Sequence, residues 1–241
     1  MIKRTIKAIK DIVFPDRCCL CGDVFSYFED EHPKILIGGN KISSPYWADC
    51  TKALMNPYCD TKEEHFEGIV IEYLFVYDRE TVEKALKHIK RTRCEKCEMF
   101  FASLLNQAIK DENIRHITYL PRSVKLHKKY GFDQSERIVS TFVRAYGKVK
   151  QINAFERNQK SSIPQKNLSA KDRFINAEKS LILDENTKLP KELLVFDDII
   201  TSGATAKTAS NLLYNGGVKK IKLIFLAKAG EITKERRKTY E

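Results

Sequence analysis

The sequence predicts an α/β protein in which a mostly parallel sheet is flanked by helices and preceded by a small cysteine-rich module. From about residue 68 onward, apolar runs of strand length alternate with stretches of helical periodicity, which is typical of parallel strands joined by crossover helices. Before that point the chain is rich in Cys, Pro, Gly and Asn. We therefore expect an N-terminal helix and cysteine module over residues 1–65 and an α/β domain over residues 66–241.

Hydrophobic periodicity and turn residues predict the individual elements. Residues 2–14 carry apolar side chains at helical spacing between lysines, which indicates a short amphipathic helix. Asp133 to Glu136 has the form of a capping box and opens a helix that runs to Gly147. A polar loop is expected at 157–167 and a short helix from Ser169. Further helices are expected at 79–110 (one long or two short) and 204–215, and strands at 69–77, 116–121, 149–155, 180–184, 192–198 and 219–227.

Composition and charge narrow the class of protein. Of the 241 residues, 42% are hydrophobic and 31% charged, which excludes a disordered or a collagen-like chain. No apolar run approaches the roughly 18 residues of a membrane span. The net charge is +11, and residues 121–180 alone hold 14 basic and 5 acidic side chains. Positive charge concentrated in this way indicates an anionic partner.

Clustered cysteines in the N-terminal quarter predict a structural zinc site. The first residues lack the continuous apolar core of a secretory signal, so we expect a cytoplasmic protein, in which such cysteines more often bind metal than form disulfides. Cys18 and Cys21 have Cys-x2-Cys spacing, and Cys50 and Cys59 could complete four closed sulfur ligands. The alternative is a set of free or core thiols.

A second Cys-x2-Cys pair, Cys94 and Cys97, lies in a stretch that is helical by its periodicity. Thiols three residues apart share one face of a helix, so they could belong to a redox or metal pair. We favour the simpler interpretation, in which they are small half-buried side chains.

The most informative segment is the run from Leu193 to Thr205. An apolar strand ends in Asp197 and Asp198, and a turn of small residues then opens a helix. The turn supplies hydroxyls and backbone N–H groups for a phosphate, whereas the carboxylates suit sugar hydroxyls and a hydrated Mg²⁺. The residues expected to hold the phosphate are Thr201, Ser202, Gly203, Ala204 and Thr205. The alternative is a plain strand end and helix cap.

This run resembles the phosphoribosyl pyrophosphate signature of type I phosphoribosyltransferases. Leu120-Pro121-Arg122-Ser123, Gly131 to Glu136, and a following polar loop with Arg157 and Arg173 resemble segments of the ComF competence family. A cysteine module followed by a phosphoribosyltransferase-like domain is also that family's layout. The resemblance implies a type I phosphoribosyltransferase-like fold, with Mg²⁺ and phosphoribosyl pyrophosphate bound by Asp197, Asp198, the turn that follows them, Arg122 and Ser123.

The sequence departs from the family pattern at two places, of which the first concerns the zinc site. Trp47 stands where a partner of Cys50 is expected, so the fourth zinc ligand is open between Cys59, which we favour, and Cys19, His32 or His65. Lys90 matches a lysine that follows the family's first helix, while an Asp a few residues later is replaced by Cys94.

The family's association with natural transformation implies a DNA-uptake factor that handles single-stranded DNA at the inner face of the cytoplasmic membrane, together with uptake or helicase proteins. The basic segment fits this implication, because cations mixed with the rings of Tyr130, Phe132 and Phe155 are typical of a single-strand track. The alternatives are a solvated basic face and, for function, an active phosphoribosyltransferase acting on a nucleobase-like acceptor. The cations expected to contact DNA are Lys125, Lys128, Lys129, Arg157, Lys160, Lys166 and Arg173.

Overall fold

A computed structural model describes most of the chain. It covers residues 17–23, 34–37, 40–46, 48–55, 58–66, 69–77, 80–109, 114–158 and 180–229. The predicted helix over residues 2–14, most of the predicted loop at 157–167 and the predicted helix from Ser169 lie outside these ranges.

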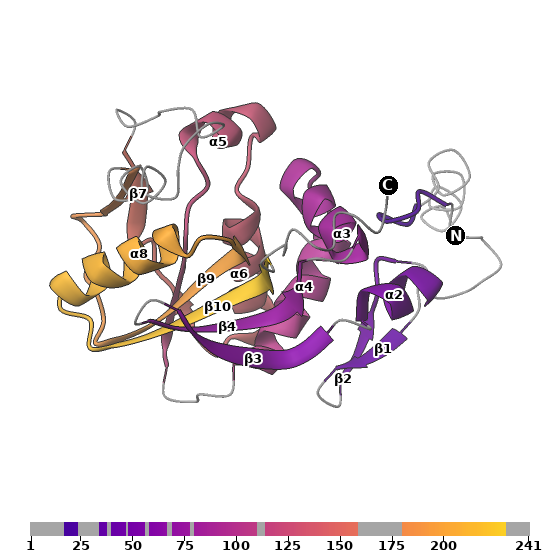
Figure 1. The fold of residues 1–241 in the computed structure, drawn as a ribbon, viewed down its shortest axis with the longest axis horizontal. Coiled ribbons are helices and arrows are strands. Elements are labelled where there is room, and N and C mark those ends of the chain that lie inside the picture. Colours follow the sequence, from indigo (N-terminus) through magenta and orange to yellow (C-terminus); the bar gives the residue numbers. More distant parts are fainter. Residues whose placement is uncertain are drawn as a thin grey trace, which may run out of the picture.

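The centre of the molecule is a six-stranded sheet (Figure 1). Neighbouring strands are parallel except for the first pair, which is antiparallel. This confirms the predicted mostly parallel α/β fold. In spatial order the strands are β3 (Tyr58–Phe66), β4 (Ile69–Val76), β10 (Lys220–Lys228), β9 (Glu192–Ile200), β5 (His116–Tyr119) and β6 (Lys150–Gln151).

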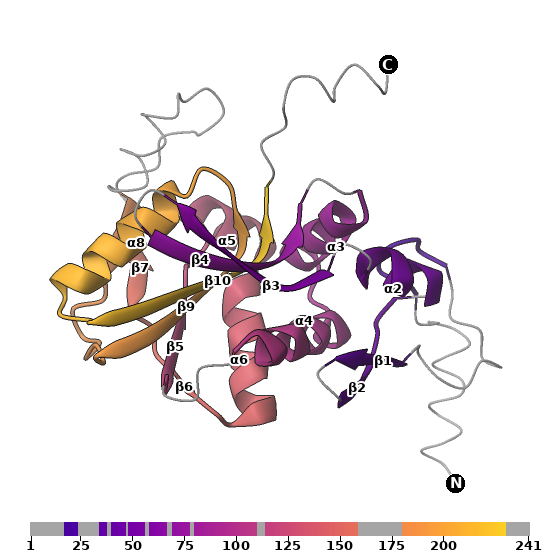
Figure 2. The same cartoon turned by 60° about the horizontal axis from the view of Figure 1, so that its bottom comes forward.

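Helices cover both faces of the sheet. Leu194 and Phe196 of β9 pack into one core with α3 (Glu80–Arg91), α4 (Glu95–Ala108) and α6 (Gln134–Tyr146). Leu193 and Val195, which alternate with them along the strand, pack into a second core with α8 (Ala204–Asn215). Figure 2 shows α8 on one side of the sheet and α4 and α6 on the other. Each fully buried large apolar side chain contributes about 1.5–3 kcal/mol to folding.

The N-terminal part packs on the edge of this domain. It contains the hairpin β1 (Lys34–Ile37) and β2 (Asn40–Ser43), the helix α2 (Ala48–Met55) and a cysteine-containing turn at residues 17–23. The ring of Tyr46 meets that of Phe100 in α4 edge-on, with centroids 5.4 Å apart. Strand β3 already belongs to the main sheet, so the sheet begins at residue 58, before the predicted domain boundary at residue 66.

Most predicted elements of the α/β domain are confirmed. The stretch 79–110 forms two helices, separated at residues 92–94, and Asp133 caps α6 by accepting hydrogen bonds from the N–H groups of Ser135 and Glu136. The predicted strand at 149–155 is divided between β6 and β7 (Phe155–Arg157), and β7 pairs with β8 (Leu181–Leu183) in a separate small sheet. Among the described residues, no helix is both long and apolar enough to cross a lipid bilayer.

Candidate functional site

The predicted phosphate turn lies where the chain direction across the sheet reverses. Strands β5 and β9 are neighbours, but the chain continues from β5 to β6 on one side and from β9 to β10 on the other. Ligands of open α/β sheets bind at such a switch point, outside the carboxyl ends of the strands. The loops that follow β5 and β9 therefore flank one site. Leu120, just after β5, and Asp197, near the end of β9, are the first residues on its two sides.

The two adjacent carboxylates of β9 are held by residues from α6. The Oγ of Ser135 donates a hydrogen bond to Oδ1 of Asp197 at 2.9 Å, and Nε2 of Gln134 donates to Oδ2 of Asp198 at 2.7 Å. Lys90, at the end of α3, adds an ion pair to Asp198 with Nζ and Oδ2 3.1 Å apart. No described residue donates a hydrogen bond to the other oxygen of either carboxyl group, so each carboxyl retains an acceptor for a ligand.

The electrostatics of this pair are asymmetric. Asp198 is buried, 4% exposed, and has the Lys90 ammonium as a counter-charge. Burial, and after it the negative charge of Asp198, raises the pKa of Asp197 to about 8. At neutral pH Asp197 is therefore largely protonated, and it can donate as well as accept a hydrogen bond.

The turn after the carboxylates has the geometry of an anion site. Gly203 is in the left-handed region with φ 66°, a conformation that glycine adopts without steric cost, and no side chain caps α8. The first amide of α8 bonded to a carbonyl one turn back is that of Lys207, which leaves the N–H groups of residues 204–206 for a ligand. A pocket of about 50 Å³ is lined by residues 197 and 199–206 of this segment together with Leu120 and Phe225.

Arg122 ties the two sides of the site together. Its Nη1 donates to the carbonyl of Phe132 at 2.9 Å and its Nη2 to the carbonyl of Lys90 at 3.1 Å. Its backbone N–H donates to Oδ2 of Asp133 at 2.6 Å. The side chain is only 8% exposed, so the structure places this predicted phosphate ligand as a clamp between α3 and the loops around the site. Ser123, also predicted to bind the ligand, is exposed and caps α5 (Val124–Tyr130) by accepting from the N–H of Leu126.

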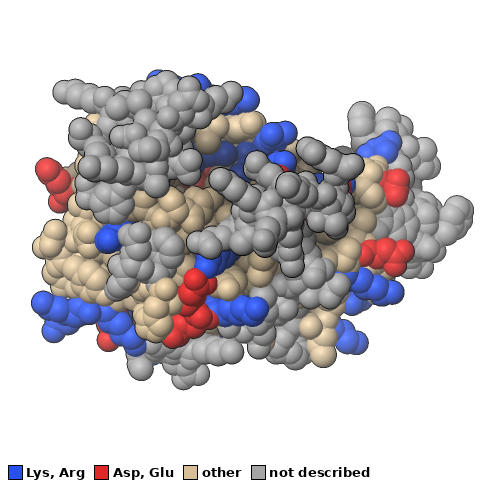
Figure 3. Space-filling model, in the orientation of Figure 1, with Lys and Arg blue, Asp and Glu red and all other residues tan. Residues whose placement is uncertain are grey.

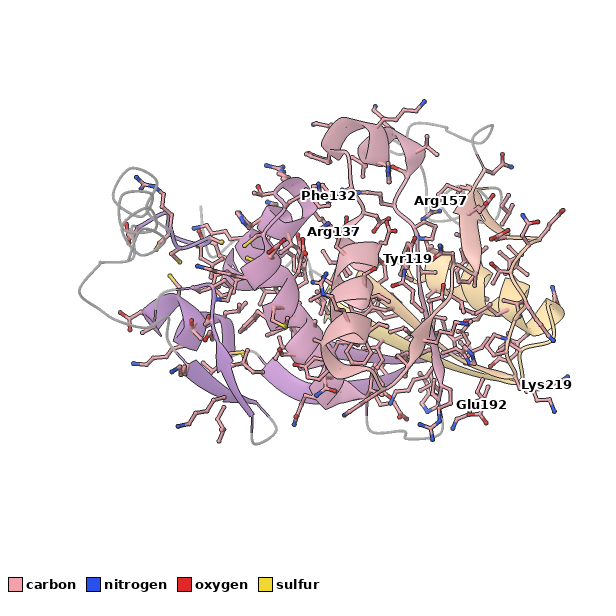
Figure 4. All side chains as sticks on the ribbon, turned by 180° about the vertical axis from the view of Figure 1, so that it is seen from behind. Tyr119, Phe132, Arg137, Arg157, Glu192 and Lys219 are labelled. Atoms are coloured by element: carbon pink, nitrogen blue, oxygen red, sulfur yellow. The ribbon has the colours of Figure 1, made fainter. Side chains whose placement is uncertain are left out.

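The predicted nucleic-acid cations separate into two groups. Lys125, Lys128 and Lys129 are exposed on α5, and Figure 3 shows Lys and Arg side chains at the top of the molecule, at the level of that helix. Arg157 is half-buried, and its Nε donates to the carbonyl of Pro121 at 2.7 Å, so it lies against the loop after β5 (Figure 4). Burial lowers its pKa, opposed by the charges of Asp197 and Asp133. Lys160, Lys166 and Arg173 lie outside the described residues.

The aromatic side chains of the predicted single-strand track do not form an exposed stacking surface. Phe132 and Phe155 are each 6% exposed and belong to the interior. Tyr130 is half-buried, and its ring is in contact with two cations, Arg122 and Lys129, each 5.1 Å from the ring centroid.

Three of the four predicted zinc ligands come together. The sulfur atoms of Cys18, Cys21 and Cys50 all lie within 4.8 Å of one another, and the Cys18–Cys21 turn is closed by a bond from the Gly22 N–H to the Cys18 carbonyl. These thiols could hold a metal ion. The side chain of Cys59 is outside the described part of the chain, as is His32; Cys19, a predicted alternative, lies in a different group of ligands.

Sequence reasoning missed the supports of the carboxylate pair. The roles of Gln134, Ser135 and Lys90 depend on contacts with residues that are 64, 62 and 108 positions away, respectively, which no local pattern reports. The available signal was the ComF-like Gly131–Glu136 motif and the lysine matched by Lys90, both recognised but without a role. Cys94 and Cys97, for which we favoured ordinary half-buried thiols, lie together with Cys19 and His88 in a second group of residues that could hold a metal ion.

Two competence proteins are similar to this chain in sequence. Competence protein ComFC of Streptococcus pneumoniae is 24% identical over 216 residues, which cover 88% of this chain and 89% of that protein. Competence protein F of Haemophilus influenzae is 30% identical over 136 residues, which cover 53% of this chain and 59% of that protein. No family model matches the chain.

Solved structures with a related shape include an adenine phosphoribosyltransferase that is 19% identical, covering 77% of this chain and 94% of that one, with a TM-score of 0.38. Another, adenine phosphoribosyltransferase from Thermoanaerobacter pseudethanolicus, is 14% identical and covers 74% and 99%, also with a TM-score of 0.38. The resemblance of this chain to the ComF competence proteins, predicted from its motifs, is confirmed by its two sequence relatives, and with ComFC it extends over nearly the whole chain.

Proposed function

We propose that this protein is a DNA-uptake factor that binds phosphoribosyl pyrophosphate, or a related phosphate ligand, and handles single-stranded DNA. One observation carries the ligand assignment: the carboxyl group of Asp197 and an uncapped helix N-terminus line the same pocket at the switch point of the sheet, and Asp198 is the next residue along the strand. The two sequence relatives, ComFC and competence protein F, are both competence proteins, which supports the role in DNA uptake.

The chemistry of the pocket fits a ribose 5-phosphate. The N–H groups of residues 204–206 and the helix dipole favour a phosphate, while the oxygens of Asp197 and Asp198 favour sugar hydroxyls. The Lys90 ammonium compensates one carboxylate, which limits repulsion of an anionic ligand. The same carboxylates would hold Mg²⁺ through its water shell, and the ion would neutralise the pyrophosphate charge.

Single-stranded DNA would bind beside this pocket. The three exposed lysines of α5 follow directly on the loop after β5 that borders the pocket, so a strand held by them would pass close to the phosphate turn. Binding by backbone phosphates requires no sequence recognition and should weaken with salt. A location at the inner face of the membrane and an association with uptake or helicase proteins belong to the same proposal.

A structural zinc ion is part of the proposed functional state. Cys18, Cys21 and Cys50 would supply three thiolates, and Cys59 remains our predicted fourth ligand. An ion closed by four protein ligands stabilises a small module that has little core of its own, and has no open position for catalysis.

Titration calorimetry with phosphoribosyl pyrophosphate and Mg²⁺ tests the ligand assignment. We expect saturable binding of one ligand per chain, and much weaker binding of ribose 5-phosphate, which lacks the pyrophosphate. Absence of heat at millimolar ligand would contradict the proposal.

An assay of pyrophosphate release on the same samples tests the alternative function, an active phosphoribosyltransferase. Arg157 favours that alternative, since a cation beside the loop after β5 could stabilise departing pyrophosphate. Pyrophosphate release in the presence of nucleobases would establish the enzyme, whereas binding without release would establish a ligand-binding module.

A further inference from the structure

A second group of metal-ligand residues lies where the cysteine turn meets the α/β domain. It consists of Cys19 from the turn, His88 from α3, and Cys94 and Cys97 from the start of α4. One ligand atom from each of the four residues lies within 4.8 Å of all the others. No residue is shared with the group formed by Cys18, Cys21 and Cys50.

The distances within this group agree with a tetrahedral zinc site. The Sγ of Cys19 lies 3.4 Å from the Sγ of Cys97 and 3.8 Å from the Sγ of Cys94. Ligands about 2.3 Å from one tetrahedral zinc ion stand about 3.8 Å apart. A disulfide joins only two sulfurs, about 2.05 Å apart, so it would not explain why a third thiol and an imidazole lie at the same place.

The helix boundaries place the ligands. Helix α3 ends three residues after His88, and only residues 92–94 separate it from α4, so that the last turn of α3 and the start of α4 supply three of the four ligands. Cys94 caps α4 by accepting a hydrogen bond from the Cys97 N–H at 3.4 Å. Both thiols are thereby held at a helix N-terminus, where the dipole favours thiolates.

Two buried polar atoms near this group have no hydrogen-bond partner among the described residues. One is Nε2 of His88 and the other is the hydroxyl of Tyr46, whose side chain is completely buried. Burial, and after it the negative charges of Cys97 and Cys19, raises the pKa of the Tyr46 hydroxyl, so this hydroxyl lies close to the cysteine group. Buried polar atoms normally have partners, and an imidazole bound to metal next to thiolates that accept a hydroxyl hydrogen bond would account for both.

We propose that Cys19, His88, Cys94 and Cys97 bind a second structural zinc ion, which fastens the cysteine turn to α3 and α4. Three sulfurs and one imidazole form a donor set typical of structural zinc, and four protein ligands leave no position for water. The consecutive residues Cys18 and Cys19 then serve different ions: one within the N-terminal module and one across its contact with the α/β domain.

Metal analysis of the full-length protein, purified without a metal-affinity tag, tests this proposal. We expect two zinc ions per chain in the wild type. The double variant Cys94→Ser with Cys97→Ser should lose one ion and keep the other, and the matched double variant Cys21→Ser with Cys50→Ser should lose the other ion and keep this one. The proposal is overturned if the Cys94/Cys97 variant keeps the full wild-type zinc content, or if the ion found is iron.

Cobalt substitution of the folded wild type tests His88 without removing a ligand. His88→Cys should retain two metal ions and shift the visible Co²⁺ bands towards those of a four-sulfur site. A spectrum identical to that of the wild type would show that His88 is not a ligand. This second variant keeps the test decisive even if the double variant fails to fold.

Discussion

The phosphate turn and the cysteine groups differ in how their residues are distributed along the chain. The turn is one continuous segment, Asp197 to Thr205, in which strand end, glycine and helix start follow in order. Together, the two cysteine groups draw on four separate segments: the turn at residues 17–23, α2, α3 and the start of α4. A ligand could be predicted for the continuous segment from sequence alone, whereas of the two thiol groups only the one with Cys18, Cys21 and Cys50 was predicted to bind metal.

The difference also concerns what each region does for the protein. The turn presents polar groups to a pocket and contributes little to the interior beyond its flanking strand and helix. The thiol groups lie where separate segments of the chain meet, alongside apolar contacts such as that between Tyr46 and Phe100. Loss of the first region should therefore abolish ligand binding in a folded protein, and loss of the second should loosen the fold around an intact pocket.

The largest expected effect separates ligand binding from folding. Replacing Asp197 and Asp198 together with Asn removes both carboxyl groups expected to bind sugar hydroxyls, and with them the Lys90 ion pair, so affinity for phosphoribosyl pyrophosphate should fall more than about 100-fold. Calorimetry measures this loss, while zinc content and the folded circular dichroism spectrum should be unchanged. Glu185→Gln, an exposed carboxyl-to-amide change, is the control. Wild-type affinity in the double variant would show that the pocket is elsewhere.

An intermediate effect tests whether the ligand region extends along α5. Reversing Lys125, Lys128 and Lys129 to Glu should weaken binding of single-stranded DNA at least about tenfold. The slope of log affinity against log salt should also fall by about 2, because each neutralised phosphate contributes about 0.7. Fluorescence anisotropy with a labelled oligonucleotide gives both quantities.

The matched control reverses three exposed lysines at the amino ends of β9 and β10: Lys188, Lys191 and Lys219. Figure 4 shows Lys219 at the opposite end of the molecule from α5. Equal losses in the two triple variants would indicate general electrostatic attraction and would contradict a track on α5. Affinity for phosphoribosyl pyrophosphate should change little in either.

A third expected effect concerns stability rather than affinity, namely its dependence on pH. The pKa of Asp197 is raised from 3.8 to about 8, so between these values the folded state holds a proton that the unfolded state releases, and stability falls as pH rises. Asp197→Asn removes this loss. Relative to wild type, the variant should gain about 3 kcal/mol between pH 5.5 and pH 9, because pH 5.5 lies about 2.5 units below the raised pKa and each unit is worth about 1.4 kcal/mol; this corresponds to roughly 6–12 °C in Tm.

Thermal unfolding at the two pH values measures this gain. Asp184→Asn is the control, because hydrogen bonds from Asn186 and Thr187 lower the pKa of Asp184, so this carboxyl is ionised at both pH values. Its Asn variant should differ from wild type by the same amount at pH 5.5 and pH 9. An Asp197→Asn variant with no greater advantage at pH 9 would show that Asp197 ionises normally.

The α/β domain could be predicted largely from sequence, because local sequence patterns are enough to predict most of its strands and helices. The apolar runs of β4, β9 and β10, the Asp133 cap of α6 and the glycine-containing turn before α8 each depend on neighbours within a few residues. The sequence did not predict β1, β2, α2 and β3: β1 and β2 have only four residues each, α2 is a short helix, and β3 is mostly polar. It also did not predict that residues 149–155 are divided between two sheets.

The sequence by itself determined the fold class, the phosphate turn with Asp197 and Asp198, the concentration of positive charge after residue 120, and the pairing of Cys18 with Cys21. Only the tertiary structure decided that Ser135, Gln134 and Lys90 hold the carboxylates, that Arg122 is a buried clamp, and that Cys19 lies with His88, Cys94 and Cys97. The physical reason is the range of the interactions. Hydrogen-bonded turns and periodic burial are local along the chain, whereas ion pairs, buried clamps and metal ligands depend on which helices the sheet brings together.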